Sequence, residues 1–356
     1  MTIFFAILIF SFLIFIHELG HFVAAKLSGV QVNEFALFMG PAIWQKQIGE
    51  TVYSLRCIPI GGYCAMEGED GEEGESDNPR SFQKAAWWKR FLILVAGAAM
   101  NFVAGVLIFG IVFMPQGAIY ANRVTHLDEC CIFQGEDGIL PGDELLEIDG
   151  EKVYVNSDIS LLLTMNDTGI HDLVILRDGR EIVVEDLAMS HTHVDENGEE
   201  YLHYGIRYDA VRELDLAGRI GYVWDNVLDT VRNVRLSLQM LLTGKAGLQD
   251  MSGPVGIITI MSDVAASSQT TLAAVMNMLY FGGFLGINLA VMNLLPIPAL
   301  DGGRVVGLLI STVYEAVTKR KLDPKYEGWI HGAGMILLLA LMGIIMFKDI
   351  FVIFAG

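Results

Sequence analysis

Charged side chains are scarce in this chain. Of its 356 residues, 18% are Asp, Glu, Lys or Arg and 53% are hydrophobic, whereas an average soluble domain carries about 25% charged residues. This composition argues against an ordinary soluble protein. The start of the chain also lacks the basic residues of a signal peptide, and an ionisable cluster at positions 17–21 interrupts its apolar run. We therefore expect residues 1–16 to belong to a membrane span and not to a cleaved leader.

The charge that is present is concentrated in one region. Residues 118–215 contain 23 acidic and 6 basic side chains, a net charge of −17 out of −19 for the whole chain. The remainder is nearly neutral and apolar. This distribution predicts a membrane protein with one acidic, water-exposed domain, and the acidic surface argues against nucleic acid as a partner.

Four apolar runs are long enough to cross a hydrocarbon core of about 30 Å as helices. They cover residues 3–27, 91–114, 272–295 and 332–354. Basic residues precede the second run and separate the third from the fourth; they are Lys84, Lys89, Arg90, Lys319, Arg320, Lys321 and Lys325. The positive-inside rule then places both basic clusters in the cytoplasm, and the N-terminus, residues 115–271 and the C-terminus outside.

The first apolar run contains the sequence HELGH at residues 17–21. His17 and His21 are four residues apart, so both lie on one face of a helix, with Glu18 beside them. This is the HExxH arrangement, in which two imidazoles bind zinc and the glutamate acts as a general base. The alternative is a polar cluster satisfied by neighbouring helices. Ionisable residues at membrane depth are costly and mark functional sites, which favours the metal site.

A second motif, NLLPIPALDGGR, covers residues 293–304. Pro296 and Pro298 have no backbone N–H, so we expect the third membrane helix to end at this point, within the membrane. An unwound segment at that depth must be surrounded by protein or by a water-filled cavity. Asp301 follows the break and is our candidate for the third zinc ligand. The alternative is a helix-ending turn with an Asp-Gly cap.

The two motifs together resemble the site-2 protease family of intramembrane zinc metalloproteases, and within it the bacterial branch that cleaves membrane-anchored anti-sigma factors. The resemblance covers nearly the whole chain. Further similar segments follow in the family's order: EFALFMGP (34–41), IPIGGYCAMEGE (58–69), NFVAG (101–105) and SGPVGI (252–257). The chain departs from the family at Ala98, where the family often has proline.

The resemblance implies roles for individual residues. His17, His21 and Asp301 would be the zinc ligands, and Glu18 the general base. Asn293 would contact the substrate backbone near the scissile bond. With the neighbouring loop and the hairpin described next, the candidate substrate-binding residues are Asn293, Pro296, Pro298, Gly61 and Gly62.

The segment TVYSLRCIPIGGYCAM (51–66) alternates apolar and polar residues and contains Gly61 and Gly62. We expect a short hairpin that turns at these two glycines. The resemblance implies that this hairpin dips into the membrane beside the zinc and offers an edge strand to the substrate. The acidic stretch at 67–79 is too polar to pack, and we expect a solvated cytoplasmic linker there.

The segment GILPGDELLEIDGEKV (138–153) has the turn, strand and second turn of a bacterial PDZ core. We place a PDZ-like module at about residues 120–190, followed by a hairpin through VDENGEE (194–200). PDZ domains add an extended peptide to a sheet edge, so screening of substrates is a natural role. Residues 216–271 are expected to form an amphipathic helix on the outer membrane surface.

The remaining cysteines and histidines carry weaker signals. Cys57 and Cys64 are expected to be packing residues, and the state of the adjacent Cys130 and Cys131 is left open. His191, His193 and His203 share one face of the expected hairpin. We interpret them as surface histidines in preference to a second metal site.

The expected fold is a polytopic α-helical membrane protein with four transmembrane helices, a membrane-associated β-hairpin and an inserted extracytoplasmic PDZ-like α+β domain. Residues 1–114 hold the first two spans and the hairpin, 115–215 the PDZ-like domain, 216–271 the surface helix, and 272–356 the last two spans. The expected location is the bacterial plasma (inner) membrane, with the zinc site toward the cytoplasm.

The expected activity is zinc-dependent hydrolysis of peptide bonds in or near transmembrane segments, as the second cut of regulated intramembrane proteolysis. The expected partners are the lipid bilayer and a single-span membrane protein already trimmed by another protease, such as an anti-sigma factor or a signal-peptide remnant. Two alternatives remain open. One is a catalytically silent membrane scaffold that binds through its PDZ-like domain. The other is the pro-sigma-factor-processing branch of the same family, which typically lacks a PDZ domain and carries a C-terminal nucleotide-binding module.

Overall fold

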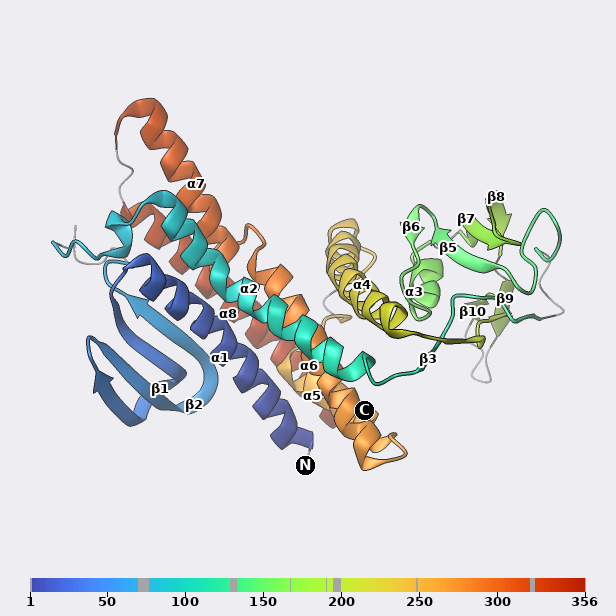
Figure 1. The fold of residues 1–356 in the computed structure, drawn as a ribbon, viewed down its shortest axis with the longest axis horizontal. Coiled ribbons are helices and arrows are strands. Elements are labelled where there is room, and N and C mark those ends of the chain that lie inside the picture. The colour runs from blue at the N-terminus through green and yellow to red at the C-terminus, as the bar shows by residue number, and fades with distance from the viewer. Residues whose placement is uncertain are drawn as a thin grey trace. The chain divides into compact units, whose positions relative to one another are not determined.

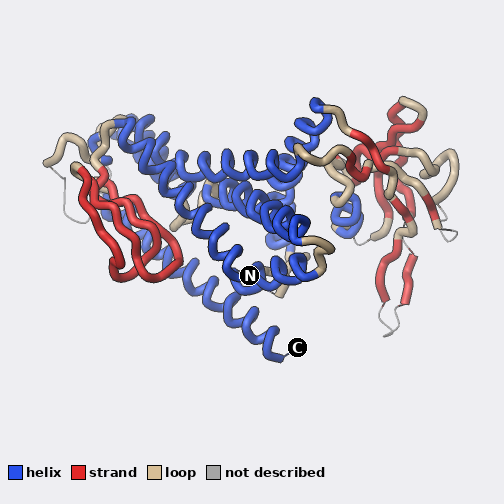
Figure 2. The backbone as a smooth tube through the Cα atoms, turned by 60° about the horizontal axis from the view of Figure 1, so that its bottom comes forward, coloured by secondary structure: helices blue, strands red, loops and turns tan. Residues whose placement is uncertain are grey.

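The computed structural model describes residues 2–69, 77–128, 133–166, 168–189, 191–194, 200–247, 249–320 and 324–355. The chain divides into two compact units. One comprises Met1–Phe109 and Thr230–Gly356, and the other comprises Gly110–Asp229. Figure 1 shows the order of the elements along the chain, and Figure 2 distinguishes helices from strands. Cys130 and Cys131 lie outside the described residues.

The four expected spans are confirmed as long apolar helices. They are α1 (Thr2–Ser28), α2 (Trp87–Phe113), α6 (Thr271–Asn293) and α8 (Pro324–Ala355). Each is long and apolar enough to cross a membrane. A short 3₁₀ turn at Phe82–Lys84 precedes α2. The second and fourth helices begin four and eight residues before the apolar runs do, because the flanking polar residues continue the helix.

The expectation of one amphipathic helix over residues 216–271 is wrong. Two helices occupy this stretch: α4 (Leu216–Thr243), which runs from one unit into the other, and α5 (Pro254–Ala266). Proline at the first position starts α5, where a missing N–H costs nothing. Met261 and other apolar residues of α5 pack against α1 and α6, so α5 belongs to the helix bundle.

A further helix was not expected. It is α7 (Asp301–Thr318), which begins at the candidate zinc ligand. Added Cβ atoms at Gly302 and Gly303 would lie 2.2 and 2.4 Å from backbone oxygens of the preceding loop. The loop therefore folds tightly over the first turn of α7, and this fold requires glycine at both positions.

The helices of the first unit pack closely through small residues. An added Cβ at Gly20 of α1 would lie 2.3 Å from the Ala96 oxygen of α2, and one at Gly105 of α2 would lie 2.9 Å from the Gly283 oxygen of α6. Such small-residue contacts are how helices approach each other in membranes. They hold α1, α2 and α6 together.

A sheet formed by β1 (Val32–Ile48) and β2 (Thr51–Met66) packs against α1 (Figures 1 and 2). Its turn lies between Ile48 and Thr51, which are paired. Both strands are bent, so residues 34–37 pair with residues 62–65 on one side and with 52–55 on the other. The expected turn at Gly61 and Gly62 is therefore wrong. Gly61 has φ +72 and marks a bend inside β2.

The second unit contains a four-stranded sheet in the order β6–β5–β7–β8. Its strands are β5 (Glu144–Ile148), β6 (Glu151–Lys152), β7 (Ile170–Arg177) and β8 (Arg180–Ala188), with the helix α3 (Asp158–Thr164) between β6 and β7. Leu145, Ile148, Ile159, Leu173 and Ile175 are fully buried and form its core.

Smaller strand pairs complete this unit. They are β3 (Ala118–Tyr120) with β12 (Val211–Glu213), β4 (His126–Leu127) with β11 (Ile206–Arg207), and β9 (His191–Val194) with β10 (Glu200–His203). The hairpin expected through residues 194–200 is present as β9 and β10, although 195–199 lie outside the described part of the chain. His203 pairs with His191 across this hairpin.

Candidate metal centre

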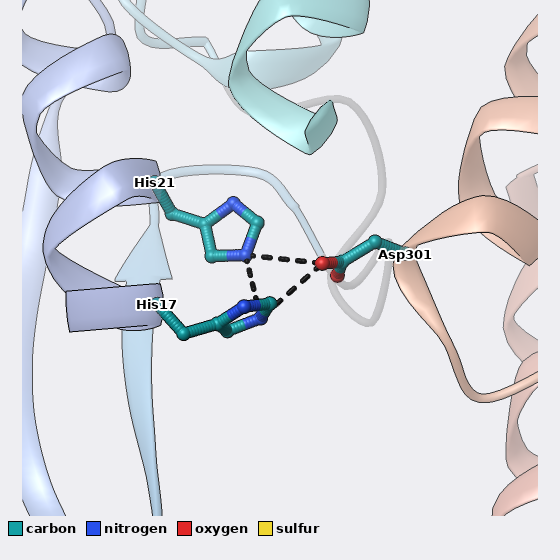
Figure 3. A group of neighbouring side chains, drawn as sticks. All are labelled: His17, His21 and Asp301. Atoms are coloured by element: carbon teal, nitrogen blue, oxygen red, sulfur yellow. Dashed lines mark hydrogen bonds and ion pairs between the residues drawn. The ribbon is translucent and has the colours of Figure 1, made fainter. Parts of the chain in front are cut away.

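Two histidines of α1 and one aspartate of α7 converge on one point (Figure 3). The Nε2 atoms of His17 and His21 are 3.2 Å apart. Asp301 Oδ2 lies 3.2 Å from the first and 3.4 Å from the second. The helical spacing of four residues places the two rings one turn apart, and the start of α7 brings the carboxylate to them. The side chains are 10–19% exposed.

The helix α2 fixes which nitrogen of each ring faces this point. His21 Nδ1 donates its proton to the backbone oxygen of Ile93 at 2.8 Å, which leaves Nε2 with a lone pair. His17 Nδ1 lies 3.4 Å from the side-chain amide of Asn101. With the amide nitrogen of Asn101 toward His17, the amide oxygen is buried and has no hydrogen-bond partner among the described residues. Turning the amide over lets this oxygen accept from His17 Nδ1–H, so both rings present Nε2.

The same helix provides the space for the rings. A Cβ added at Gly97 of α2 would lie 2.3 Å from His21 Nε2 and 2.8 Å from His17 Cε1. No real Cβ atom makes contacts under 3.0 Å. Only glycine at this position therefore lets both imidazoles face Asp301.

These three acceptor atoms fit a tetrahedral metal ion. Ligands about 2.0–2.2 Å from zinc lie about 3.3 Å from one another in a tetrahedron, close to the 3.2, 3.2 and 3.4 Å found here. Asp301 Oδ2 is buried and accepts no hydrogen bond from the part of the chain that the structure describes. Lone pairs directed at one buried point repel each other unless a cation lies between them. The donor set of two imidazoles and one carboxylate is that of catalytic zinc sites, which keep one position open.

Glu18 lies beside this cluster and faces the sheet. Its carboxylate lies within electrostatic reach of His17, His21 and Asp301 and close to the backbone amide of Cys64 in β2. Gly62 of β2 is also close, since an added Cβ there would lie 3.2 Å from Glu18 Cγ. The β2 segment around Gly62 therefore borders the candidate catalytic carboxylate.

The other candidate substrate residues lie on the loop before Asp301. Asn293 is the last residue of α6, and Pro296 and Pro298 are exposed on the loop. The helix α6 therefore ends before the first proline, two residues earlier than the expected end of the span at residue 295. The residue that precedes a proline is disfavoured in helical conformation, which accounts for part of this difference. Gly61 contacts the side chain of Met39 at the bend of the sheet, away from the turn that we expected.

Comparison with known proteins agrees with this arrangement. The model of peptidase family M50 matches residues 5–341. The chain belongs to this family. Family M50 is the site-2 protease family that the two motifs resemble, so the resemblance is confirmed and the chain is a metalloprotease of this kind.

Three relatives illustrate the similarity. A protein of Clostridium perfringens named as a zinc metalloprotease is 37% identical over 351 residues, which are 98% of each chain. One of Clostridium acetobutylicum with the same kind of name is 35% identical over 97% of this chain and 96% of its own. The regulator of sigma-W protease RasP of Bacillus subtilis is 26% identical to this chain. The alignment covers 97% of each of the two chains.

Sequence reasoning did not single out the residues of α2 that support the site. Gly97 and Asn101 are one helical turn apart within an apolar run, and both face α1. A polar residue and a glycine at helical spacing inside a membrane span are a detectable signal for a helix contact. The Ile93 backbone oxygen carries no sequence signal, because any residue supplies it.

Proposed function

We propose that this member of family M50 is an intramembrane zinc protease that hydrolyses peptide bonds in or near transmembrane segments. His17, His21 and Asp301 hold the zinc ion, and Glu18 is the catalytic base. The observation that carries the proposal is the convergence of three acceptor atoms at tetrahedral spacing next to Glu18, two of them on a helix long and apolar enough to cross a membrane. A catalytically silent scaffold would not need the three zinc ligands and the catalytic base together.

Bound zinc supplies Lewis acidity, which polarises a peptide carbonyl and activates water at neutral pH. The Glu18 carboxylate accepts a proton from the attacking water. It then returns that proton to the leaving amine as the peptide bond breaks. The β2 segment at Gly62 and Cys64 lies beside this carboxylate. The residues of α2 keep the two imidazoles in the tautomer that leaves Nε2 for the metal.

The substrate is a single membrane-spanning segment that unwinds before it is cut. A helix hides its carbonyl groups in hydrogen bonds, so cleavage requires an extended backbone. The β2 segment at Gly62 lies beside Glu18 and offers strand pairing there. Asn293, Pro296 and Pro298 border the substrate from the side of the loop. Exposed Ile43, Trp44 and Ile48 at the far end of the sheet support its contact with lipid.

The proposed place in the cell is the bacterial plasma (inner) membrane, as a multi-pass protein. The basic residues near α2 and α8 favour a metal centre toward the cytoplasm and a Gly110–Asp229 unit outside. The acidic charge of that unit and its small sheet support a PDZ-like module that excludes bulky substrate domains. The name of the B. subtilis relative, regulator of sigma-W protease, supports a role in the control of a sigma factor. The family resemblance implies that the substrate is an anti-sigma factor already trimmed by another protease. The pro-sigma-factor-processing branch, which typically lacks a PDZ domain, fits this arrangement less well.

The decisive experiment separates the base from the ligands. Glu18→Gln removes the base and leaves all three zinc ligands, so the purified variant should hold zinc at the wild-type level and cleave no transmembrane substrate. Near-wild-type cleavage by this variant would refute the mechanism.

Asp301→Ala is the matched variant. It removes one of three ligands while the base remains, so both zinc content after dialysis and cleavage should fall. Full zinc content in this variant would show that another residue completes the site.

A further inference from the structure

The loop that leads to Asp301 contains a strained turn. Leu300 N–H donates to the Ile297 oxygen at 3.1 Å, which closes a four-residue turn from Ile297 to Leu300. Pro298 is its second residue, and Ala299, its third, has φ +85. This is a type II turn, in which the third position is normally glycine or asparagine because φ is positive there. Alanine in this conformation costs free energy that its surroundings must supply.

The helix α8 supplies a partner for this turn. Ala299 N–H donates to the Nδ1 atom of His331 at 3.2 Å. One turn further along α8, Gly334 lies against Pro298, since an added Cβ would be 2.4 Å from the Pro298 Cβ and 2.7 Å from its backbone oxygen. His331 and Gly334 therefore form a seat on α8 that receives the two central residues of the turn.

The acceptor on His331 selects one of two turn geometries. Types I and II differ by a flip of the central peptide, here between Pro298 and Ala299. The flip reverses the direction of the Ala299 N–H. Type I would relieve Ala299 of its positive φ, but it would turn this N–H away from His331. The hydrogen bond therefore opposes the flip that the alanine itself favours.

The turn geometry controls where Asp301 begins its helix. Leu300, the last residue of the turn, is the N-cap of α7, and its backbone oxygen accepts from Gly303 N–H at 3.1 Å. Asp301 follows directly. The flip is a crankshaft rotation, in which the changes in ψ of Pro298 and φ of Ala299 largely offset each other and leave a net rotation of about 40°. This residual rotation would shift Leu300 and with it the Asp301 carboxylate. Metal sites tolerate ligand displacements of only about 0.2 Å.

We propose that His331 is a positioning residue of the metal centre: by accepting the Ala299 N–H, it holds the loop in the type II turn that places Asp301 against His17 and His21. This inference rests on the proposed zinc site. The hydrogen bond to His331 stabilises the positive φ of Ala299, which glycine would adopt without this help.

The test compares zinc affinity, measured by chelator competition on the full-length protein in detergent, across five variants. His331→Leu removes the acceptor and should raise the zinc Kd about 10-fold, within the range typical of residues that support metal ligands. His331→Asn places an oxygen near the position of Nδ1 and should stay within about threefold of wild type. His331→Gln, whose amide lies one carbon further out, should behave like His331→Leu. Ile336→Ala, at a 72% exposed position of α8, is the control for changes in the helix itself.

The fifth variant tests the mechanism by rescue. Glycine adopts positive φ without strain, so Ala299→Gly combined with His331→Leu should restore the zinc Kd to within about threefold of wild type. A merely structural role for His331 on α8 would not be rescued by a change in the loop. If His331→Leu does not fold, the Asn and Gln variants decide the same question.

Two outcomes overturn the inference: an unchanged zinc Kd in His331→Leu, or a loss that Ala299→Gly does not reverse. These results differ from failure of the proposed function itself. In that case the wild-type protein would bind no zinc, or Glu18→Gln would cleave.

Discussion

Replacement of Gly97 by alanine tests the metal centre most directly. Gly97 lies on α2 opposite both imidazoles. Its added Cβ would be 2.3 Å from His21 Nε2, whereas ordinary contacts of a Cβ atom begin at 3.4 Å. The ring must therefore retreat by about 1 Å. The two helices cannot separate instead at low cost, because Gly20 of α1 already lies against the Ala96 backbone of α2.

The size of the expected effect follows from the tolerance of zinc coordination. A displacement of about 1 Å is several times the roughly 0.2 Å that a metal–ligand distance allows. Loss of His21 as a ligand leaves two protein ligands, so we expect the zinc Kd to rise by at least about 100-fold, beyond the loss typical of supporting residues. Alanine is also the better helix former by about 1 kcal/mol. The substitution therefore harms the site without an intrinsic cost to α2.

The assay is zinc content after dialysis against a graded series of chelator, together with thermal unfolding of the metal-free protein. The control is Gly110→Ala on the same helix, where an added Cβ meets no described atom within 4 Å. This control should keep wild-type zinc content. If Gly97→Ala binds zinc as wild type does, the imidazoles do not lie where the structure places them and the proposed ligand set is wrong.

Three further predictions concern the surroundings of the site. Asn101→Ala removes the acceptor for His17 Nδ1–H and should raise the zinc Kd about 10-fold; an unchanged Kd would show that the amide does not orient the ring. Hydrogen bonds from Arg80 lower the pKa of Glu50 to about 2 in the folded protein. The ionised carboxylate therefore stabilises the fold above the unfolded-state pKa of about 4.5. This stabilisation is lost as the pH falls from about 4.5 toward 2. At pH 7 the melting temperature of wild type should exceed that of Glu50→Gln, and the two should converge between pH 4.5 and pH 2. A difference that stays constant over this range would contradict the pairing of Glu50 with Arg80. Replacing about residues 120–210 with a flexible linker should preserve cleavage of trimmed substrates and increase cleavage of untrimmed ones. Loss of trimmed-substrate cleavage in a zinc-loaded protein would contradict the proposal that the PDZ-like module excludes bulky substrates.

The shared face of His17 and His21 on α1 was predictable because it depends on local geometry alone. An apolar run of this length forms a helix in a membrane, and residues 17 and 21 of a helix must lie on one face. The third ligand was a different kind of prediction. No periodicity relates Asp301 to α1, so its place came from the family resemblance and from the two prolines that break the chain before it.

The turn of the sheet was mispredicted for a physical reason. Alternation along residues 51–66 fits one long strand as well as two short ones, and Gly61 and Gly62 suggested the second. The sheet instead bends. Phe38 and Gly40 in β1 have φ +71 and +84, and Gly61 in β2 has φ +72. Glycine in a strand can mark a bend as well as a turn, and only the pairing with the partner strand decides which.

The helices α5 and α7 escaped prediction because neither is long and apolar enough to read as a membrane span. They are 13 and 18 residues long. Their positions depend on contacts with other helices. The start of α5 is fixed by Asp349 of α8, whose carboxylate accepts from the backbone amides of Gly253 and Gly256. A cap supplied from another helix leaves no local signature in the sequence of the helix that it caps.

The metal centre has the same dependence on other elements. The three ligand atoms repel one another without a cation, so packing must hold them together. His17 and His21 are oriented by Asn101 and the Ile93 oxygen of α2, and the carboxylate of α7 is placed by a turn seated on α8. Each ligand is thus fixed by a helix other than its own. The site is complete only when α1, α2, α7 and α8 are packed together, and without this packing Glu18 would lie beside no metal-binding site.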